Sequence, residues 1–273
     1  MRYDRQSLLP QFSQGRLADA RVLVVGAGGL GSCLLLHLAG AGVATSSLGS
    51  LHVMDADTVS LDNLHRQVIH RTQDVGINKA ASAVRAISDL NADVNVTFSR
   101  DFLSVKSIED LITSFNLVID CTDNLPTKVL LNDACMAKSI NFLTASAVRW
   151  HGQINYFPGS GEYGCYRCVF GDLPPSKILK SAKTVGVVGS VVGVIASWQA
   201  TEALKIIMQL PDDQLLSGQM LSCDLLNNKT RFIKLKRKNP SCNSCGNNKL
   251  TVFEQNQHLW NVNEPECIPK TDF

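Results

Sequence analysis

Three glycines with the spacing Gly-x-Gly-x-x-Gly, namely Gly26, Gly28 and Gly31, follow an apolar run at residues 21–25 and open a helical pattern. The apolar run is typical of a strand that is buried on both faces. Glycines at these positions permit a tight turn, let the backbone approach a phosphate and let the helix pack closely on the strand. Because the helix N-terminus offers unpaired N–H groups to an anion, the spacing predicts a nucleotide-binding loop.

An acidic residue ends the next predicted strand, residues 51–55. Asp55 has the position of the acid that accepts hydrogen bonds from a ribose hydroxyl. It lies 29 residues after Gly26, whereas the usual spacing is about 20 residues. The loop at 45–50 (TSSLGS) accounts for the difference. Asp57 is the alternative residue for this role, and a solvated acid at the end of a strand is the alternative explanation.

A dense polar run, ADTVSLDNLHRQ at residues 56–67, follows, and a dehydrogenase has no obvious use for it. Doubly wound sheets bind ligands at the carboxyl ends of their strands, where we expect Arg66, Lys79 and the DCTDN segment at 120–124 to converge. Two cations and a carboxylate suit a triphosphate with Mg²⁺, with Asp123 on the metal and the cations on the phosphate oxygens. Each residue alone could be a surface charge, but together they indicate phosphate chemistry.

Two Cys-x-x-Cys pairs, Cys165/Cys168 and Cys242/Cys245, are separated by 73 residues. Two such pairs supply the four thiolates of a closed tetrahedral zinc site, and closed sites are structural. We therefore predict a Cys₄ zinc site that ties the end of the chain to its middle. A thioredoxin-type redox pair is the alternative, but we expect neither pair to begin a helix after a first strand. The other cysteines are expected to be small buried apolar residues: Cys33, Cys121, Cys135, Cys223 and Cys267.

Strands and helices alternate over the first half of the chain. The patterns predict strands at 21–25, 51–55, 94–99, 116–121 and 140–146, and helices at 30–41, 79–90, 107–115 and 126–137. This alternation predicts an α/β fold with a doubly wound, mostly parallel, Rossmann-like sheet. Beyond it, INYFP and RFIKLK predict strands of a mixed extension of that sheet, with an apolar helix at about 187–208 between them.

Composition excludes several classes of protein. Of the 273 residues, 45% are hydrophobic and 18% are charged, which excludes global disorder. The net charge of +2 argues against a dedicated nucleic-acid binder. The N-terminus has no apolar signal segment, and the uncharged stretch at 184–200 is short for a bilayer span. With nine cysteines expected to be reduced thiols or metal ligands, we predict a cytoplasmic protein without a membrane segment.

These motifs together resemble the ubiquitin-activating-enzyme-like adenylyltransferases, the group that includes MoeB, ThiF and HesA. The resemblance covers residues 1–246 as one adenylyltransferase domain and leaves 247–273 as a polar C-terminal tail. At least seven motifs occur in order: RYDRQ at 2–6, VVGAGGLGS at 24–32, MDADTVSLDNLHRQ at 54–67, Gly76-x-x-Lys79, DCTDN at 120–124, GQI at 152–154, CYRC at 165–168 and NPSCNSCG at 239–246.

The resemblance implies that the protein binds ATP and Mg²⁺ and adenylates the C-terminal glycine carboxylate of a small ubiquitin-like sulfur-carrier protein ending in Gly-Gly, with release of pyrophosphate. A carboxylate needs no general base, because it is already ionised near pH 7. Catalytic roles fall on Arg66, Lys79, Asp123 and on Arg5, which would enter the partner's site in a homodimer. Nucleotide contacts fall on Gly28, Gly29, Asp55, Asp62, Asn63, Leu64, His65, Arg66, Gln67, Lys79, Asp123 and Asn124.

The sequence departs from the family pattern at two places. The 45–50 region is about five residues longer than the usual connection, which bears on the assignment of Asp55. Ala182 stands where many relatives carry a cysteine that bonds covalently to the carrier, so we expect adenylation without transfer onto this loop. Because no rhodanese-like segment follows, a separate sulfur donor is expected.

Other functions stay open at this stage. A family relative that adenylates a tRNA-bound or small-molecule carboxylate is one alternative, and the cysteine pairs argue mildly against it. A non-catalytic scaffold that binds a ubiquitin-like tail is another, and the presence of Arg66, Lys79 and Asp123 argues against it. The sequence does not identify the carrier protein.

Overall fold

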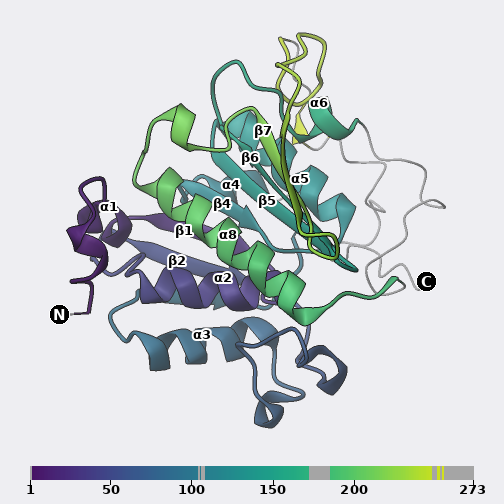
Figure 1. Ribbon diagram of the computed structural model, residues 1–273. Coiled ribbons are helices and arrows are strands. Elements are labelled where there is room, and N and C mark those ends of the chain that lie inside the picture. Colours follow the sequence, from purple (N-terminus) through teal and green to yellow (C-terminus); the bar gives the residue numbers. More distant parts are fainter. Residues whose placement is uncertain are drawn as a thin grey trace.

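The computed structural model describes residues 2–103, 105, 108–171, 185–247, 251–252 and 254. Its centre is an eight-stranded sheet with the strand order β3-β2-β1-β4-β5-β6-β7-β8, which confirms the predicted Rossmann-like class (Figure 1). The strands are β1 Arg21–Val25, β2 Ser50–Met54, β3 Val96–Ser99, β4 Leu117–Asp120, β5 Asn141–Val148, β6 His151–Phe157, β7 Gln219–Asp224 and β8 Lys229–Lys234.

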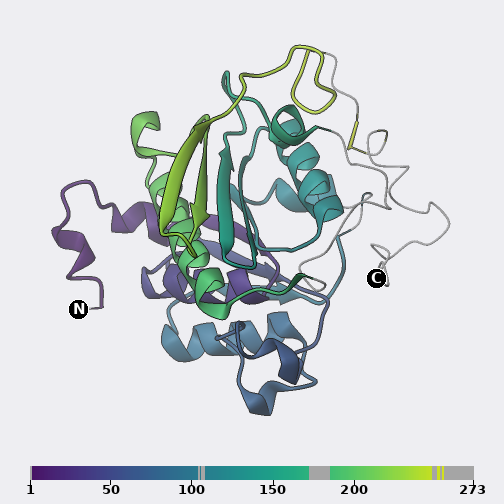
Figure 2. The same ribbon diagram turned by 45° about the vertical axis from the view of Figure 1, so that its right-hand side comes forward.

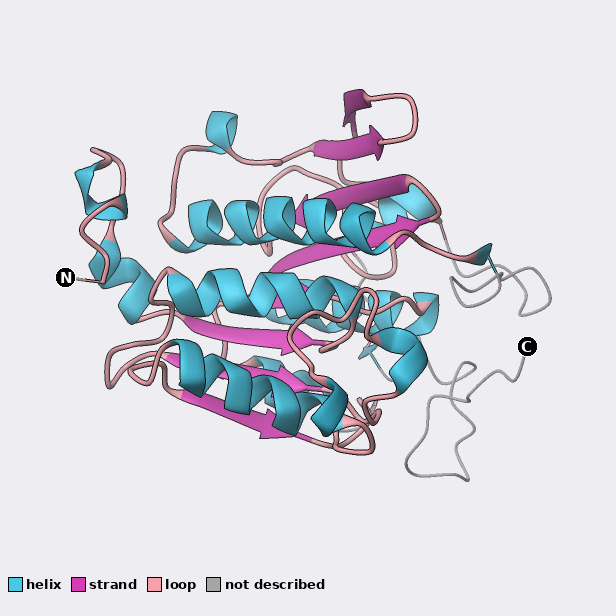
Figure 3. Ribbon diagram, turned by 60° about the horizontal axis from the view of Figure 1, so that its bottom comes forward, coloured by secondary structure: helices cyan, strands magenta, loops and turns pink. Residues whose placement is uncertain are grey.

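Helices cover both faces of the sheet. They are α1 Gln14–Ala18, α2 Gly29–Gly40, α3 Lys79–Leu90, α4 Ile108–Ile112, α5 Leu125–Lys138, α6 Tyr166–Phe170 and α8 Gly189–Ile207. Helices α8, α2 and α3 lie side by side on one face (Figure 3), and α4 and α5 cover the other. Each face has its own hydrophobic core. Figure 2 shows the sheet between the helices of the two faces.

Strands β1 to β5 are parallel, as the alternation of strands and helices predicted. From β5 onward the sheet is antiparallel, which confirms the mixed extension. The predicted INYFP strand is the second half of β6, which begins at His151. Strand β7 was not predicted from the sequence, because only two of its positions are fully buried and its polar and apolar residues alternate weakly.

The strand register places several side chains in one row across the sheet. Met54 pairs with Val25, Val25 with Asp120, Asp120 with Thr144, and Thr144 with Asn155. The residues that follow β2, β1 and β4 therefore meet at the same edge, where a doubly wound sheet binds its ligands.

The apolar helix predicted at 187–208 is α8. It packs against α2 and buries Val191, Val192, Ile195 and Ala196. Within the part of the chain that the structure describes, no helix combines the length and the hydropathy that crossing a bilayer requires.

Candidate active site

The glycine loop between β1 and α2 leaves no room for side chains at Gly26, Gly29 and Gly31. Gly26 has a φ of +97°, and a Cβ there would lie 3.0 Å from the backbone of Cys121. A Cβ on Gly31 would overlap the carbonyl oxygen of Gly26, and one on Gly29 would lie 2.9 Å from Val192. The loop is thus a tight cradle at the N-terminus of a twelve-residue helix, where backbone N–H groups and the helix dipole favour an anion.

Asp55 follows β2 directly, so the long 45–50 loop has not moved it from the end of the strand. Its carboxylate accepts hydrogen bonds from the N–H groups of Ala27, at 2.7 Å, and of Asp57, at 2.9 Å. Burial raises the pKa of Asp55, while the charge of Lys79 and these two bonds oppose the rise. The side chain therefore fixes the glycine loop, and a carboxylate has further lone pairs for a ligand.

Lys79 is the first residue of α3 and is 7% exposed. Its Nζ lies 3.0 Å from Oδ2 of Asp57, and among the described residues this carboxylate is its one bonded partner. An ammonium group has three donors. Lys79 consequently holds a positive charge beside the loop, with donors left for a ligand.

The turn at 61–67 packs on the glycine loop. A Cβ on Gly29 would lie 3.7 Å from both Cγ and the carbonyl oxygen of Arg66, and the guanidinium of Arg66 donates to the side chain of Asn63. Gln67 is 3% exposed, and its Oε1 has no hydrogen-bond partner among the described residues. A Cβ on Gly28 would lie 3.5 Å from Nε2 of Gln67, so the donor end of this amide faces the glycine loop.

Three other residues of this turn, which the resemblance implied as nucleotide contacts, lie farther toward the protein surface. Asp62 and His65 are exposed and Leu64 is half-buried. A hydrogen bond with Ser60 is the main cause that lowers the pKa of Asp62. These three side chains lie at the rim of the turn.

Asp123 lies three residues beyond β4 and is exposed. Its carboxylate makes no hydrogen bond or ion pair with any described residue, so its oxygens are available to a cation such as Mg²⁺. The neighbouring Asn124 has a structural task, because its side chain caps α5 by accepting from the N–H of Thr127 at 2.8 Å.

Arg5 is not brought to this group. The N-terminal arm lies at the far end of α2, where Gln6 donates to the carbonyl of Ala41 at 2.8 Å. Twelve helical residues at 1.5 Å each separate that end from the glycine loop by about 18 Å. Within one chain, therefore, Arg5 does not reach the site.

The sequence analysis missed a buried ion pair on the other side of β4. The ammonium of Lys128 binds the carboxylate of Asp120 and donates to Thr144 Oγ1 at 3.1 Å and to the carbonyl of Ala145 at 2.8 Å. Helix α5 is buried on nearly every side from Thr127 to Met136. A lysine inside such a helix must be paired. The place of Lys128 within an apolar helix pattern was therefore a signal in the sequence for a buried ion pair.

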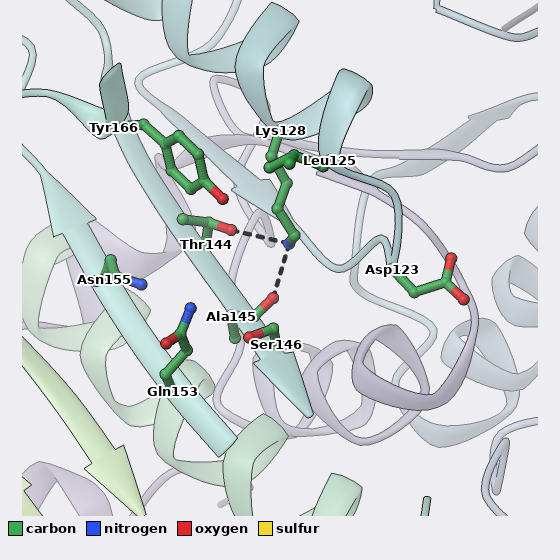
Figure 4. A pocket seen from close by; sticks show the side chains of 9 residues that line it. All are labelled: Asp123, Leu125, Lys128, Thr144, Ala145, Ser146, Gln153, Asn155 and Tyr166. Carbon is green, nitrogen blue, oxygen red and sulfur yellow. Dashed lines mark hydrogen bonds between the residues drawn. The ribbon is translucent and has the colours of Figure 1, made fainter. Parts of the chain in front are cut away.

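A small pocket of about 100 Å³ lies beside this ion pair (Figure 4). Sites for drug-sized ligands measure about 300–1,000 Å³, so this pocket by itself is smaller than such a site. Its lining residues are Asp123, Leu125, Lys128, Thr144, Ala145, Ser146, Gln153, Asn155 and Tyr166.

The four predicted zinc ligands form one cluster, with all four sulfur atoms within 4.8 Å of one another. Sγ of Cys165 lies 3.7 Å from that of Cys242, and Sγ of Cys168 lies 3.4 Å from that of Cys245. A tetrahedral site with Zn–S bonds of about 2.3 Å separates its sulfurs by about 3.8 Å, so the cluster fits zinc.

Cys165 is the N-cap residue of α6, but this helix follows β6 and not the first strand. The first pair therefore does not have the thioredoxin-type position, as expected. Of the remaining cysteines, Cys121, Cys135 and Cys223 are buried as predicted and Cys33 is partly exposed. Cys267 and Ala182 lie outside the described residues.

Comparison with known proteins identifies the family. The model of the ThiF family matches residues 3–244. The adenylyltransferase and sulfurtransferase MOCS3 of Dictyostelium discoideum is 38% identical over 93% of this chain and 58% of its own length. The mouse protein of the same name is 42% identical over 90% of this chain and 52% of its own length. This chain thus spans between half and three-fifths of these relatives.

Solved structures share the fold at lower identity. MccB of E. coli has a TM-score of 0.74 at 23% identity and covers 91% of this chain and 73% of its own. MccB solved with ATP has a TM-score of 0.69 at 22% identity, covering 85% and 68%. Because the model of the ThiF family matches residues 3–244, which is most of the chain, the chain belongs to the ThiF family.

Proposed function

We propose that this protein is an ATP-dependent adenylyltransferase, which activates the C-terminal glycine carboxylate of a small ubiquitin-like sulfur-carrier protein and releases pyrophosphate. The proposal is carried by one observation: the turn at 61–67 (the Arg66 turn), Lys79 and the end of β4 lie around one glycine loop. The names of the MOCS3 relatives, adenylyltransferase and sulfurtransferase, support it.

The phosphates of ATP would lie on the backbone N–H groups at Gly28 and Gly29, with the side-chain NH₂ of Gln67 as a further donor beside them. A carboxylate oxygen of the carrier attacks the α-phosphorus, the bond from that phosphorus to the bridging oxygen breaks, and pyrophosphate leaves. Arg66 and Lys79 offset the negative charge that accumulates on the phosphate oxygens. Asp123 would hold Mg²⁺, which supplies further positive charge when it is bound.

Four finer proposals accompany this one. Arg5 would act on the site of a second copy in a homodimer, because it does not reach its own. The four cysteines would hold a structural zinc ion that joins the segment at 165–168 to the segment at 242–245. We also propose a cytoplasmic location and a separate sulfur donor.

Pyrophosphate exchange into ATP tests the function. We expect exchange that requires Mg²⁺ and a ubiquitin-like protein ending in Gly-Gly. Arg66→Ala and Asp123→Ala should each abolish it, whereas Asp89→Ala, an exposed acid on α3, should leave it unchanged. Normal exchange by either site variant would refute the assignment.

A further inference from the structure

His70 is a buried titratable side chain that lies three residues after the Arg66 turn and has no role in the steps above. It is 6% exposed. Nε2 of its ring lies 2.8 Å from the carbonyl oxygen of Ala27 in the glycine loop, and Nδ1 lies 2.9 Å from Oγ of Ser82 on α3. The imidazole ring therefore connects the glycine loop to a helix that packs on the same face of the sheet.

The carbonyl that His70 bonds belongs to the same peptide group as the N–H of Gly28. A trans peptide group is planar, and its C=O and N–H point in opposite directions. The described residues include no cis peptide bond. The bond from His70 consequently fixes the plane of this group from behind, and with it the direction of the Gly28 N–H.

One backbone group at this position is left open for a ligand. The N–H of Ala27 donates to Oδ2 of Asp55 at 2.7 Å, and its C=O accepts from His70. The C=O of Gly28 accepts from the N–H of Ser32 at 2.9 Å and from its hydroxyl at 2.6 Å. The N–H of Gly28 has no acceptor in the part of the chain that the structure describes, so this donor is available to a phosphate.

The partners of the ring determine which of its nitrogens carries the hydrogen. A carbonyl oxygen only accepts, so Nε2 of His70 is the donor to Ala27. Burial lowers the pKa of His70, so the ring is neutral at about pH 8 and its Nδ1 accepts. The hydroxyl of Ser82 is the donor that Nδ1 meets. Ser82 thus favours the tautomer with which His70 bonds the loop.

Asp74 supports Ser82 in turn. The carboxylate of Asp74 is buried, and its Oδ2 lies 2.9 Å from the hydroxyl of Ser82. Asp74 also accepts from the N–H of Arg71 at 2.9 Å and binds the guanidinium of Arg85. Since Asp74 already has these two donors, the single hydrogen of the Ser82 hydroxyl is available to His70.

We propose that His70 is a positioning residue of the nucleotide site, which holds the peptide group between Ala27 and Gly28 so that the Gly28 N–H points at a phosphate. Ser82 fixes the tautomer that makes this bond. The inference rests on the proposed function, because the phosphate is that of ATP. His70 acts through the loop, so its replacement should weaken the binding of the nucleotide and leave the binding of the carrier unchanged.

Two substitutions of His70 separate the hydrogen bond from packing. In His70→Leu, which removes the donor, the Kd for ATP with Mg²⁺ from calorimetry and the KM for ATP in the exchange assay should rise about fivefold, the usual effect of one hydrogen bond. The KM for the carrier should stay within twofold. His70→Gln, whose side-chain amide supplies an N–H in place of Nε2, should keep both values for ATP within twofold of wild type.

A role in packing alone predicts the same affinity for ATP in both variants, measured below their unfolding transitions. That result, or an ATP affinity in His70→Leu equal to wild type, would overturn the inference. Absence of ATP binding by the wild-type protein would instead refute the proposed function.

Nitrogen NMR of the His70 ring at about pH 8 gives an independent readout. We expect the hydrogen on Nε2 in the wild-type protein. Ser82→Ala should transfer part of it to Nδ1, because Nδ1 then faces the carboxylate of Asp74 with no donor between them. Ser88→Ala, an exposed serine on the same helix, should leave the tautomer unchanged. A hydrogen on Nδ1 alone in the wild-type protein would contradict the bond to Ala27, and an unchanged tautomer in Ser82→Ala would contradict the role of Ser82.

Discussion

Two buried lysines on either side of β4 have opposite surroundings. Lys79 is 7% exposed and Lys128 is 6% exposed. Among the described residues, Lys79 bonds one carboxylate, that of Asp57, which is half exposed to solvent. Lys128 bonds three oxygens, and its carboxylate partner Asp120 is fully buried. Burial alone therefore does not distinguish a ligand-binding cation from a structural one; the number and the hydration of its partners do.

The comparison divides the molecule by task. On the Lys79 side, the glycine loop, the Arg66 turn and Asp123 leave charges and N–H groups open to a substrate. On the Lys128 side, the ion pair fixes α5 to the ends of β4 and β5, and neutral amides line the adjoining pocket. The first side suits an anionic nucleotide, whereas the second holds the helix and the strands together.

Replacing Lys79 should give the largest effect. In Lys79→Met we expect pyrophosphate exchange to fall by about 10²–10³-fold, the usual loss when one group that stabilises developing charge is removed. The midpoint of thermal unfolding should change little, because water can hydrate the half-exposed Asp57. A large drop in that midpoint together with full exchange would erase the distinction between the two lysines.

Replacing Lys128 should act on stability instead. Lys128→Met leaves the buried carboxylate of Asp120 unpaired, and we expect a loss of about 3–5 kcal/mol in the free energy of unfolding. Urea denaturation measures it. Lys138→Met is the matched control on the same helix, since its ion pair with Glu109 is partly exposed and should cost at most about 1 kcal/mol. Equal losses in the two variants would contradict a structural role for Lys128.

Removing a cluster cysteine should weaken the Lys128 side alone. We expect Cys242→Ser to lose the one zinc ion per chain and to unfold at a lower temperature, because binding a structural metal contributes directly to folding. Affinity for ATP, measured by calorimetry below the unfolding transition, should stay within threefold of wild type. Cys33→Ser, outside the cluster, should keep its zinc. Wild-type protein purified without zinc would refute the metal assignment.

The smallest effect concerns His70, which bonds the carbonyl of Ala27 in the glycine loop at 2.8 Å. Burial lowers the pKa of His70 below its ordinary value of about 6.5, and the charge of Lys79 lowers it further. A lowered histidine pKa means that its contribution to stability is complete above about pH 6.5 and is lost as the pH falls through the folded-state pKa.

NMR titration of the His70 ring would sharpen the comparison. Lys79→Met should raise the pKa of His70, since it removes a nearby positive charge, and Lys128→Met should leave that pKa unchanged. Equal shifts in both variants would show that the two lysines do not belong to separate regions.

The sequence predicted the features that local patterns determine. The apolar run before Gly26 gave β1, and the helix expected at 79–90 has those bounds. The two cysteine pairs were predicted to share one site because each pair lacks two ligands. These inferences needed only spacing and periodicity.

Features that depend on neighbours from distant segments were missed. Asp120 belongs to an apolar strand pattern, and nothing local shows that its carboxylate meets Lys128 eight residues later. Asn155 looked like an ordinary strand residue until the register placed it opposite Thr144. That the side-chain oxygen of Asn124 caps α5 was likewise not predicted.

The location of the nucleotide tests the central claim most directly. In a crystal structure with a non-hydrolysable ATP analogue and Mg²⁺, we predict that the phosphates lie on the N–H groups of Gly28 and Gly29, with a phosphate oxygen within hydrogen-bond distance of Lys79 Nζ. Phosphates bound instead beside Lys128 or Asn155 would contradict the account.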